Sequence, residues 1–528
     1  MMTITRRAVL HGAVLSALAP SMSWAFDKEG DRKILVFSGN QAVPVLDPHV
    51  RYDWSTRMIQ QSVYDGLLKY VGNPPRIIPW LAEKYEASPD GLTYTFHLVG
   101  NAKFHNGDPV DAEAVRYSFE RALKLNAGVA WMLKDFLKPE KITAVDAKTV
   151  RFVLERPFQP FISYVPWWYI VNPKQVQANV VDGDYGKKWL TENEAGSGPF
   201  KLKRFDSTAL IHMDAVPDYW KGWPMGDKNR LSGVIYRIVR EAAPRRAGLQ
   251  RREMDVVTNM SPDDMQQLAK LPGVRAEDHP GSTTFGIKFN CQTGPTADIN
   301  LRKAIAYAFD YEALITIHNG GAKLMDSPFP PTMEGHIPVP GIPRKDVAKA
   351  KEFLAKTKTP SGGIELEYVH VQGLEDARRI GLVLLDSLRT LDIKLNIVGQ
   401  PWPTMVARGS KPDTAANMTS VYVTPIGTDP DTVAFQYHRD SWGLYYGMSH
   451  YEDKEAWAMI AEARGLTDKA RRMALYGEIQ KRIVADQPEI FGMIPNRTWA
   501  MRDYVKGFEF SPVRFTGEVD LYPMWIDA

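Results

Sequence analysis

The chain is too long to fold around one hydrophobic core. Its 528 residues exceed the roughly 250–300 residues at which single cores stop growing, so we expect it to divide into lobes. Hydrophobic residues make up 44% and charged residues 24%, values typical of folded globular proteins. The chain has one cysteine, Cys291, so no intramolecular disulfide can form and the fold must depend on core packing.

Strand and helix patterns alternate along the chain. Residues 33–37 form a short apolar run before a turn signal, which predicts a buried strand. Residues 92–98 and 149–154 alternate apolar and polar side chains, as half-buried strands do. Between them, Asp111 precedes apolar residues at helical spacing and is expected to be a helix N-cap.

Three further stretches predict helices that pack on sheets. Apolar side chains recur at helical spacing over residues 301–309 and 377–391. A late helix is expected after Thr467-Asp468, with Met473, Tyr476, Ile479 and Ile483 inward and Arg471, Arg472, Lys481 and Arg482 facing water. Since no fixed internal period occurs, these patterns predict a mixed α/β (α+β) protein with several lobes and not a repeat array.

The N-terminus has the pattern of an export signal. Arg6-Arg7 precedes an apolar run that ends near Ala19 and is too short to span a bilayer. Small residues at Ser23 and Ala25 predict cleavage after Ala25, so residues 1–25 are interpreted as a signal peptide that resembles the twin-arginine type. A retained membrane anchor is the alternative.

Signals for catalysis, metals and nucleic acid are lacking. No G-x-S-x-G or H-E-x-x-H motif occurs, so we predict no catalytic residue, metal or cofactor. Residues 196–200 are interpreted as a tight turn and not a phosphate loop, and Cys291 as a small buried residue and not a nucleophile. Lys plus Arg number 65 against 62 Asp plus Glu, too balanced a charge for binding nucleic acid.

Aromatic residues are the stronger functional signal. The chain has 14 Trp and 22 Tyr, and residues 167–169 and 442–446 form aromatic clusters. Such rings suit ligand recognition by stacking and hydrogen bonding. The alternative for each ring is packing in a core or between lobes.

Several stretches, in this order, resemble one protein family over nearly the whole mature chain. They are residues 46–49, 63–68, 79–85, 90–98, 103–110, 196–202, 217–220, 301–305 and 429–431. The chain is similar to the extracellular solute-binding proteins of family 5, which include the dipeptide- and oligopeptide-binding proteins of bacterial ABC importers. The resemblance implies two lobes that close on a ligand by a hinge, the first lobe being split into two subdomains.

By this resemblance the chain divides into three parts. The first subdomain is expected at residues 27–69, 190–286 and 492–528, the second at 70–189, and the opposing lobe at 287–491. The closed form would depend on the ligand, and a permease could recognise it.

The resemblance also implies a set of ligand-binding residues. These are Tyr52, Trp54, Thr284, Phe285, Trp402, Ile426, Thr428 and Asp429. Peptide-binding relatives carry an aspartate that pairs with the ligand's α-ammonium group, and this chain has Ile426 there. A buried ammonium without a carboxylate costs several kcal/mol, so the departure argues against a free peptide in the usual pose. Asp429 could substitute only if the loop is rebuilt.

The sequence therefore predicts a periplasmic substrate-binding protein and not an enzyme. It would capture a peptide or peptide-like solute as a monomer and deliver it to the permease subunits of an ABC transporter in the inner membrane. One alternative is a non-peptide solute, such as an oligosaccharide or an opine. A secreted hydrolase is the alternative from another class, and it lacks a visible catalytic set. Nickel binding occurs among relatives, but no histidine cluster favours it here.

Overall fold

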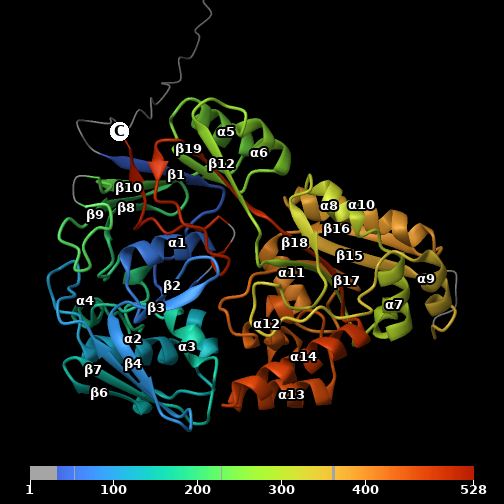
Figure 1. Ribbon diagram of the computed structural model, residues 1–528, viewed down its shortest axis with the longest axis horizontal. Helices are drawn as coiled ribbons and strands as arrows, with labels where there is room; N and C mark the ends of the chain where they lie inside the picture. Colours follow the sequence, from blue (N-terminus) through green and yellow to red (C-terminus); the bar gives the residue numbers. More distant parts are fainter. Residues whose placement is uncertain (1–32, 53, 227–228, 359–362, 516, 528) are drawn as a thin grey trace, which may run out of the picture.

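The computed structural model describes residues 33–52, 54–226, 229–358, 363–515 and 517–527. It confirms a mixed α/β protein with two lobes that lie side by side (Figure 1). The expected signal peptide lies outside the described residues. No helix in the described part is long and apolar enough to cross a membrane.

The first lobe contains a seven-stranded sheet in the order β12-β19-β11-β1-β10-β9-β8. The strands are β1 (Ile34–Gly39), β8 (Phe200–Asp206), β9 (Leu210–Ala215), β10 (Gly233–Ile238), β11 (Val256–Thr258), β12 (Val274–His279) and β19 (Arg497–Arg502). β1 pairs in parallel with β10 and β11, and the other neighbours are antiparallel. Three helices belong to this part, α1 (Trp54–Val63), α5 (Ala242–Gln250) and α6 (Pro262–Leu268).

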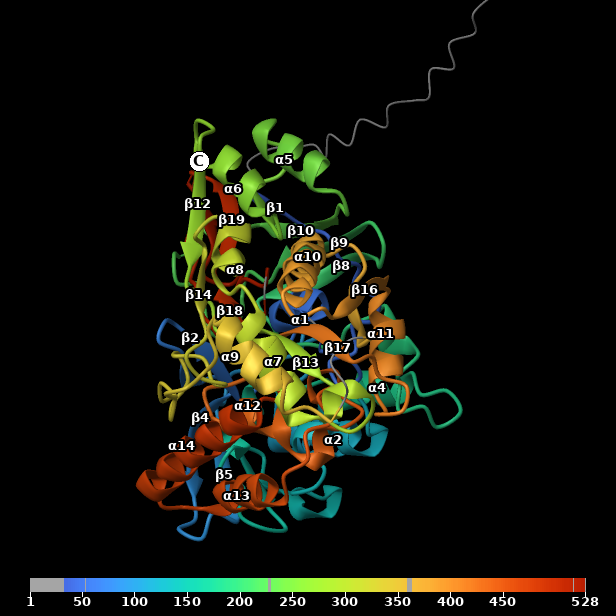
Figure 2. The same cartoon turned by 90° about the vertical axis from the view of Figure 1, so that its right-hand side faces the viewer.

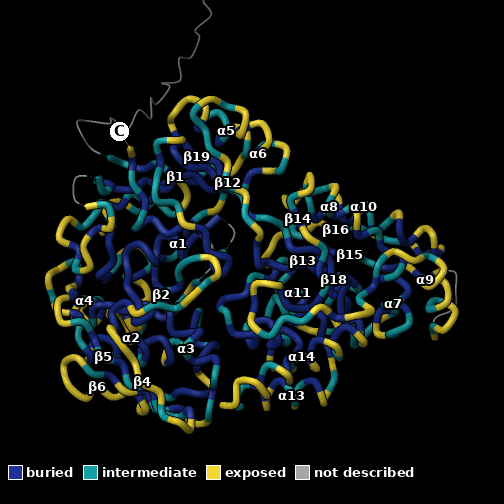
Figure 3. The backbone as a smooth tube through the Cα atoms, viewed as in Figure 1, coloured by how far each residue is buried: buried dark blue, intermediate teal, exposed yellow. Residues whose placement is uncertain are grey.

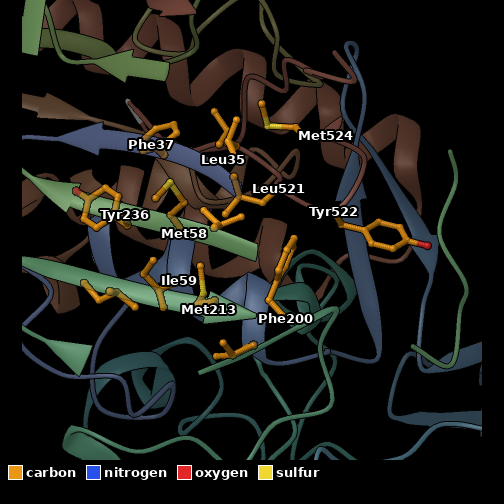
Figure 4. Packing of buried hydrophobic residues seen from close by; sticks show 14 of the residues in the cluster. Leu35, Phe37, Met58, Ile59, Phe200, Met213, Tyr236, Leu521, Tyr522 and Met524 are labelled. Carbon is orange, nitrogen blue, oxygen red and sulfur yellow. The ribbon is translucent and has the colours of Figure 1, made fainter. Parts of the chain in front are cut away.

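The core of this lobe joins distant parts of the chain. Leu35 and Phe37 of β1 pack with Met58 and Ile59 of α1, and with the C-terminal Leu521 (Figure 4). These side chains have no exposed surface, so the last residues of the chain complete the first core.

A four-stranded sheet in the order β4-β5-β7-β6 forms the rest of the first lobe. Its strands are β4 (Ala82–Ala87), β5 (Thr93–Leu98), β6 (Ile142–Asp146) and β7 (Thr149–Val153). Helices α2 (Ala112–Leu125), α3 (Phe161–Tyr164) and α4 (Pro173–Ala178) accompany it. Two antiparallel strand pairs complete the lobe, β2 (Leu68–Val71) with β3 (Arg76–Pro79), and β20 (Val505–Lys506) with β21 (Trp525–Ile526).

The predicted strands and helix of this region are confirmed. Buried side chains alternate with partly or fully exposed ones along β5 and β7, as the sequence predicts. The Asp111 carboxylate accepts a hydrogen bond from the Ala114 amide at 2.9 Å and so caps α2. At the other end, Asn126 takes the left-handed conformation that commonly ends a helix.

The second lobe contains a six-stranded sheet in the order β14-β18-β13-β17-β15-β16. The strands are β13 (Thr284–Phe289), β14 (Ala322–Leu324), β15 (Glu365–Val371), β16 (Lys394–Gln400), β17 (Met418–Val423) and β18 (Glu489–Pro495). The helices are α7 (Ile299–Ala308), α8 (Glu312–Ile317), α9 (Val347–Leu354), α10 (Glu375–Arg389), α11 (Trp402–Gly409), α12 (Asp431–Ala434), α13 (Lys454–Gly465) and α14 (Lys469–Asp486). Figure 3 shows buried segments inside each lobe and exposed loops at the rims.

The chain passes between the two large sheets at two places. β12 ends at His279 and β13 begins at Thr284, while β18 ends at Pro495 and β19 begins at Arg497. These antiparallel strands lie along one edge of the molecule, with β12 and β19 above β14 and β18 in Figure 2. Two short connections therefore join the lobes. The residue limits given above for the three parts remain a prediction.

One expectation for α14 is wrong. Asp468 caps the helix by accepting from the Arg471 amide, and Tyr476, Ile479 and Ile483 are buried, as predicted. Arg472, however, is buried and does not face water. It lies four residues before Tyr476 and so belongs to the same inward-facing stripe of the helix. There its guanidinium donates hydrogen bonds to the Asp429 carboxylate.

Candidate functional site between the lobes

Aromatic side chains from both lobes meet where the lobes face each other. Trp131, which follows α2, stacks on Phe435, which follows α12, with ring centroids 5.8 Å apart and an interplanar angle of 4°. Trp131 also approaches Tyr446 at 6.1 Å and donates a hydrogen bond from Nε1 to the Tyr52 hydroxyl at 2.9 Å. The ring contacts of Trp131 with Phe435 and Tyr446 join residues about 300 positions apart in the sequence.

Trp167 forms a second contact between the lobes. Its Nε1 donates a hydrogen bond to the Ile426 carbonyl oxygen at 2.5 Å. Its ring lies edge-on to Tyr52 at 5.9 Å and to Phe515 at 5.3 Å. The Arg57 guanidinium lies 4.0 Å from the centroid of the Trp167 ring. At this distance the cation and the aromatic face attract each other. Arg57 is in turn paired with Glu518.

The loop after β17 brings three predicted residues to this contact. Ile426 is buried and packs in the hydrophobic cluster of the first lobe's smaller sheet, although it belongs to the second lobe. The Thr428 amide donates to the Tyr70 hydroxyl at 3.4 Å. Between them, a Cβ on Gly427 would lie 2.8 Å from that hydroxyl, so any larger residue here would force Tyr70 or the loop to shift.

The Asp429 carboxylate is engaged inside the second lobe. Both of its oxygens accept hydrogen bonds from Arg472, at 2.7 and 2.8 Å. Asp431 is paired in the same way with Arg464, at 2.7 and 3.3 Å. Because a bidentate arginine satisfies each carboxylate, neither is available to pair with a ligand ammonium group in this arrangement.

The remaining predicted residues lie in different surroundings. Phe285 is buried in β13 and packs on Tyr422 at 4.8 Å, and the Thr284 hydroxyl donates to the Val423 carbonyl oxygen at 3.4 Å. Trp402 is 41% exposed at the start of α11 and lies edge-on to Tyr445 at 5.3 Å. Trp54 is the first residue of α1, and its side chain is outside the described part.

Two of the site's aromatic residues were missed by the sequence analysis. Tyr445, Tyr446 and Trp167 belong to clusters that the aromatic pattern singled out, but Trp131 and Phe435 stand in no such cluster. Their pairing comes only from the tertiary fold, so no local sequence signal could have found it.

The Tyr446 hydroxyl is poised for a polar contact. It is buried and has no hydrogen-bond partner among the described residues. Burial raises the pKa of Tyr446 well above its ordinary value, so the hydroxyl stays protonated at neutral pH. A buried hydroxyl without a partner costs about 1–3 kcal/mol, which a bound solute could offset.

Neighbouring features of the first lobe are structural. A cavity of about 20 Å³ between Arg57, Asp65 and Lys69 has room for one water molecule and not for a solute. The turn at residues 196–200 packs so closely on α1 that a Cβ on Gly196 would lie 1.8 Å from the Val63 carbonyl oxygen, in agreement with the tight-turn interpretation.

Catalytic and metal-binding chemistry finds no support in the described residues. No group of three or more His, Cys, Asp or Glu side chains there is placed to hold a metal ion. Burial raises the pKa of the Cys291 thiol to about 11, which disfavours the nucleophilic thiolate.

Comparisons with known proteins agree on one family. The model of the bacterial extracellular solute-binding proteins, family 5 (middle region), matches residues 76–443. The probable D,D-dipeptide-binding periplasmic protein of Escherichia coli (strain K12) is 29% identical over 96% of this chain and 98% of its own length.

Solved structures match nearly the whole fold. A periplasmic binding protein of Helicobacter pylori in complex with the peptide STSA has a TM-score of 0.81 and 24% identity, covering 94% of this chain and 98% of that one. A binding protein of A. tumefaciens R10 in complex with agropinic acid has a TM-score of 0.80 and 25% identity, covering 94% and 99%.

Proposed function

Because the chain belongs to the bacterial extracellular solute-binding proteins of family 5, we propose that it captures a peptide or peptide-like solute between its lobes and delivers it to an ABC importer. The observation that carries this function is the aromatic contact between the lobes, with Trp131 stacked on Phe435. Rigid aromatic walls with a few polar groups are typical of small-molecule sites. The relative named for D,D-dipeptides supports a peptide-like solute.

The proposed role implies a cellular location and a set of partners. The protein acts in the periplasm as a monomer without catalytic activity, and its partners are the permease subunits of the importer. Export through residues 1–25, by the twin-arginine route, is part of the proposal and is motivated by Arg6-Arg7. A relative described as periplasmic supports this location.

The ligand set of the proposal combines residues of both lobes. It comprises Tyr52, Ile426, Thr428 and Trp402 from the sequence prediction, together with Trp131, Trp167, Phe435 and Tyr446. The predicted set is completed by Trp54, Thr284, Phe285 and Asp429. The role of Asp429 is indirect, because its pair with Arg472 fixes the loop that carries Ile426 and Thr428. Ring stacking would position the solute, and the Tyr446 hydroxyl would hydrogen-bond to it.

A non-peptide solute is the second candidate. Ile426 stands where an amine-pairing aspartate is expected, and Asp429 is already paired with Arg472. No carboxylate is thereby left for a ligand ammonium group in this loop. A similar protein is known in complex with agropinic acid, so the scaffold accepts ligands other than peptides.

Native mass spectrometry of the mature protein purified from a bacterial host tests the proposal. A mass excess that is released on unfolding, and that fragments as a peptide, is the expected result. Fragments of a sugar or another non-peptide acid would favour the second candidate. A protein that carries no solute and binds none in a thermal-shift screen of dipeptides, oligosaccharides and opines would overturn solute capture.

A further inference from the structure

Arg497 occupies the place where the two lobes are joined. It is the first residue of β19, immediately after Asn496, at which the chain leaves the second lobe. Its Nη2 donates a hydrogen bond to the Thr283 hydroxyl in the other connection between the lobes. Thr283 in turn lies 2.9 Å from the hydroxyl of Thr424, which begins the loop that carries Ile426.

Arg497 also interacts with the charged pair beside the aromatic site. The carboxylate of Glu518 interacts electrostatically with Arg497, but its Oε1 accepts from Arg57 and its Oε2 accepts from the Phe515 amide at 3.1 Å. Arg57 covers the Trp167 ring, which contacts Tyr52. Arg497 therefore contacts the threonine pair directly, and it interacts electrostatically with Glu518, whose partner Arg57 covers Trp167.

The guanidinium of Arg497 is poorly satisfied. The side chain is 2% exposed, and its Nε and Nη1 have no hydrogen-bond partner among the described residues. Within that part of the chain, Arg497 alone among the arginines leaves a terminal guanidinium nitrogen buried and unpaired. Arg121, by contrast, is equally buried and places both terminal nitrogens on Asp47.

Charge balance at the site points to an anionic ligand group. Burial lowers the pKa of Arg497 to about 10, with Glu518 opposing the shift, so the group is still charged at neutral pH. A buried cation without a direct carboxylate partner is costly. Glu518 is paired with Arg57, and the loop carboxylates Asp429 and Asp431 are paired with Arg472 and Arg464. Among these groups, Arg497 is the one that has no carboxylate hydrogen-bonded to it.

We propose that Arg497 binds a carboxylate of the captured solute, and that the protein recognises an organic acid without requiring a free ammonium group. The carboxylate would accept from the unpaired guanidinium nitrogens beside Thr283, and the rest of the solute would lie along the rings of Tyr52, Trp131 and Trp167. This subsite rests on the proposed function. The subsite would select a carboxylate, whether the rest of the solute is a peptide or not.

Matched probes test the requirement for a carboxylate. Calorimetry would compare D-alanyl-D-alanine and L-alanyl-L-phenylalanine as free acids, as C-terminal amides and as N-acetylated acids. We expect amidation to weaken binding about 100-fold, the scale for leaving a buried charge unpaired, and N-acetylation to weaken it less than about threefold. Equal binding of an acid and its amide would overturn the subsite.

Two substitutions separate charge from geometry. Arg497→Met removes the cation at similar volume, and we expect it to abolish the preference for acid over amide. Arg497→Lys keeps the charge without the planar fork and should retain part of that preference. The matched control is Arg245→Met, in the same lobe, because Arg245 is equally buried but donates to the carbonyl oxygens of Val239, Arg240 and Asn259. If Arg497→Met binds the free acid as tightly as the wild type, the subsite is wrong.

Thermal unfolding without ligand tests the role of Arg497 even if no probe binds. Failure of every probe would count against peptide capture and not against the subsite. A ligand-binding Arg497 is an uncompensated charge, so Arg497→Met should leave the melting temperature unchanged or raise it, while Arg245→Met lowers it. A fall of more than about 5 °C in Arg497→Met would identify a structural arginine and overturn the inference.

Discussion

At the scale of single residues, His49 couples the stability of the first lobe to pH. It has no exposed surface, its Nδ1 accepts from Arg121 at 2.9 Å, and its Nε2 donates to the Tyr169 carbonyl oxygen at 2.9 Å. Burial, and then Arg121, lower the pKa of His49 from 6.5 to about 4. Between these values the unfolded chain binds a proton that the folded chain does not, so stability falls as the pH falls.

The prediction for His49 is a loss of about 2 kcal/mol in unfolding free energy between pH 7 and pH 5. His49→Gln, which can accept and donate in the same places without titrating, should lack this part of the loss. Urea unfolding of both proteins at the two pH values measures the difference. Identical pH dependence in the two proteins would show that His49 is not the titrating group.

Asp429 and Arg472 yield a second prediction at this scale. Asp429→Ala leaves the buried Arg472 without its partner, and we expect the unfolding free energy to fall by about 3 kcal/mol. The double variant Asp429→Ala with Arg472→Met removes both charges and should recover much of that loss. If Asp429→Ala unfolds like the wild type but loses binding of free-amine dipeptides, the carboxylate serves the ligand instead.

The same pair shows that residue type alone can mislead about burial. Arg472 occupies an inward position of α14 by its spacing from Tyr476, yet its charge suggested a solvated face. Its partner Asp429 lies 43 positions earlier in a loop, so no local sequence pattern predicts the bidentate pair. Spacing was therefore the better guide to the burial of Arg472 than its charge.

At the scale of elements, the cap of α2 is open to direct measurement. Asp111→Ala removes the acceptor of the Ala114 amide, and we expect a loss of about 1 kcal/mol in unfolding free energy. Asp111→Asn keeps an acceptor oxygen and should lose less than half of that. Chemical denaturation compares the three proteins. Equal losses in both variants would indicate that charge at the helix end, and not the hydrogen bond, is responsible.

Elements were predictable where burial is periodic. β5, α2 and α10 follow from apolar spacing, because one face of each packs on a single core. The site did not follow in the same way. Ile426 was singled out as a departure from the family pattern, but its packing in a cluster of the other lobe depends on how two separately folded lobes meet.

At the scale of the whole molecule, individual side-chain and backbone contacts hold the lobes together away from the two connections. They include the Trp131–Phe435 stack, the bond from Trp167 to the Ile426 carbonyl, and a backbone bond from Gln159 N to Arg464 O at 2.8 Å. An aromatic pair contributes about 1 kcal/mol beyond its buried area. Since 1.4 kcal/mol is a tenfold change in population, losing one such contact should measurably favour separated lobes.

Trp131→Ala should therefore give a larger radius of gyration by small-angle X-ray scattering of the ligand-free protein. Trp457→Ala is the matched control, because Trp457 is also half-buried but donates its Nε1 to Tyr437 within the second lobe. A solute that contacts both lobes should return the Trp131→Ala variant toward the compact form, since it binds that form better. If Trp131→Ala scatters like Trp457→Ala and the wild type, the aromatic stack does not contribute to closure, and the two connections alone set the arrangement of the lobes.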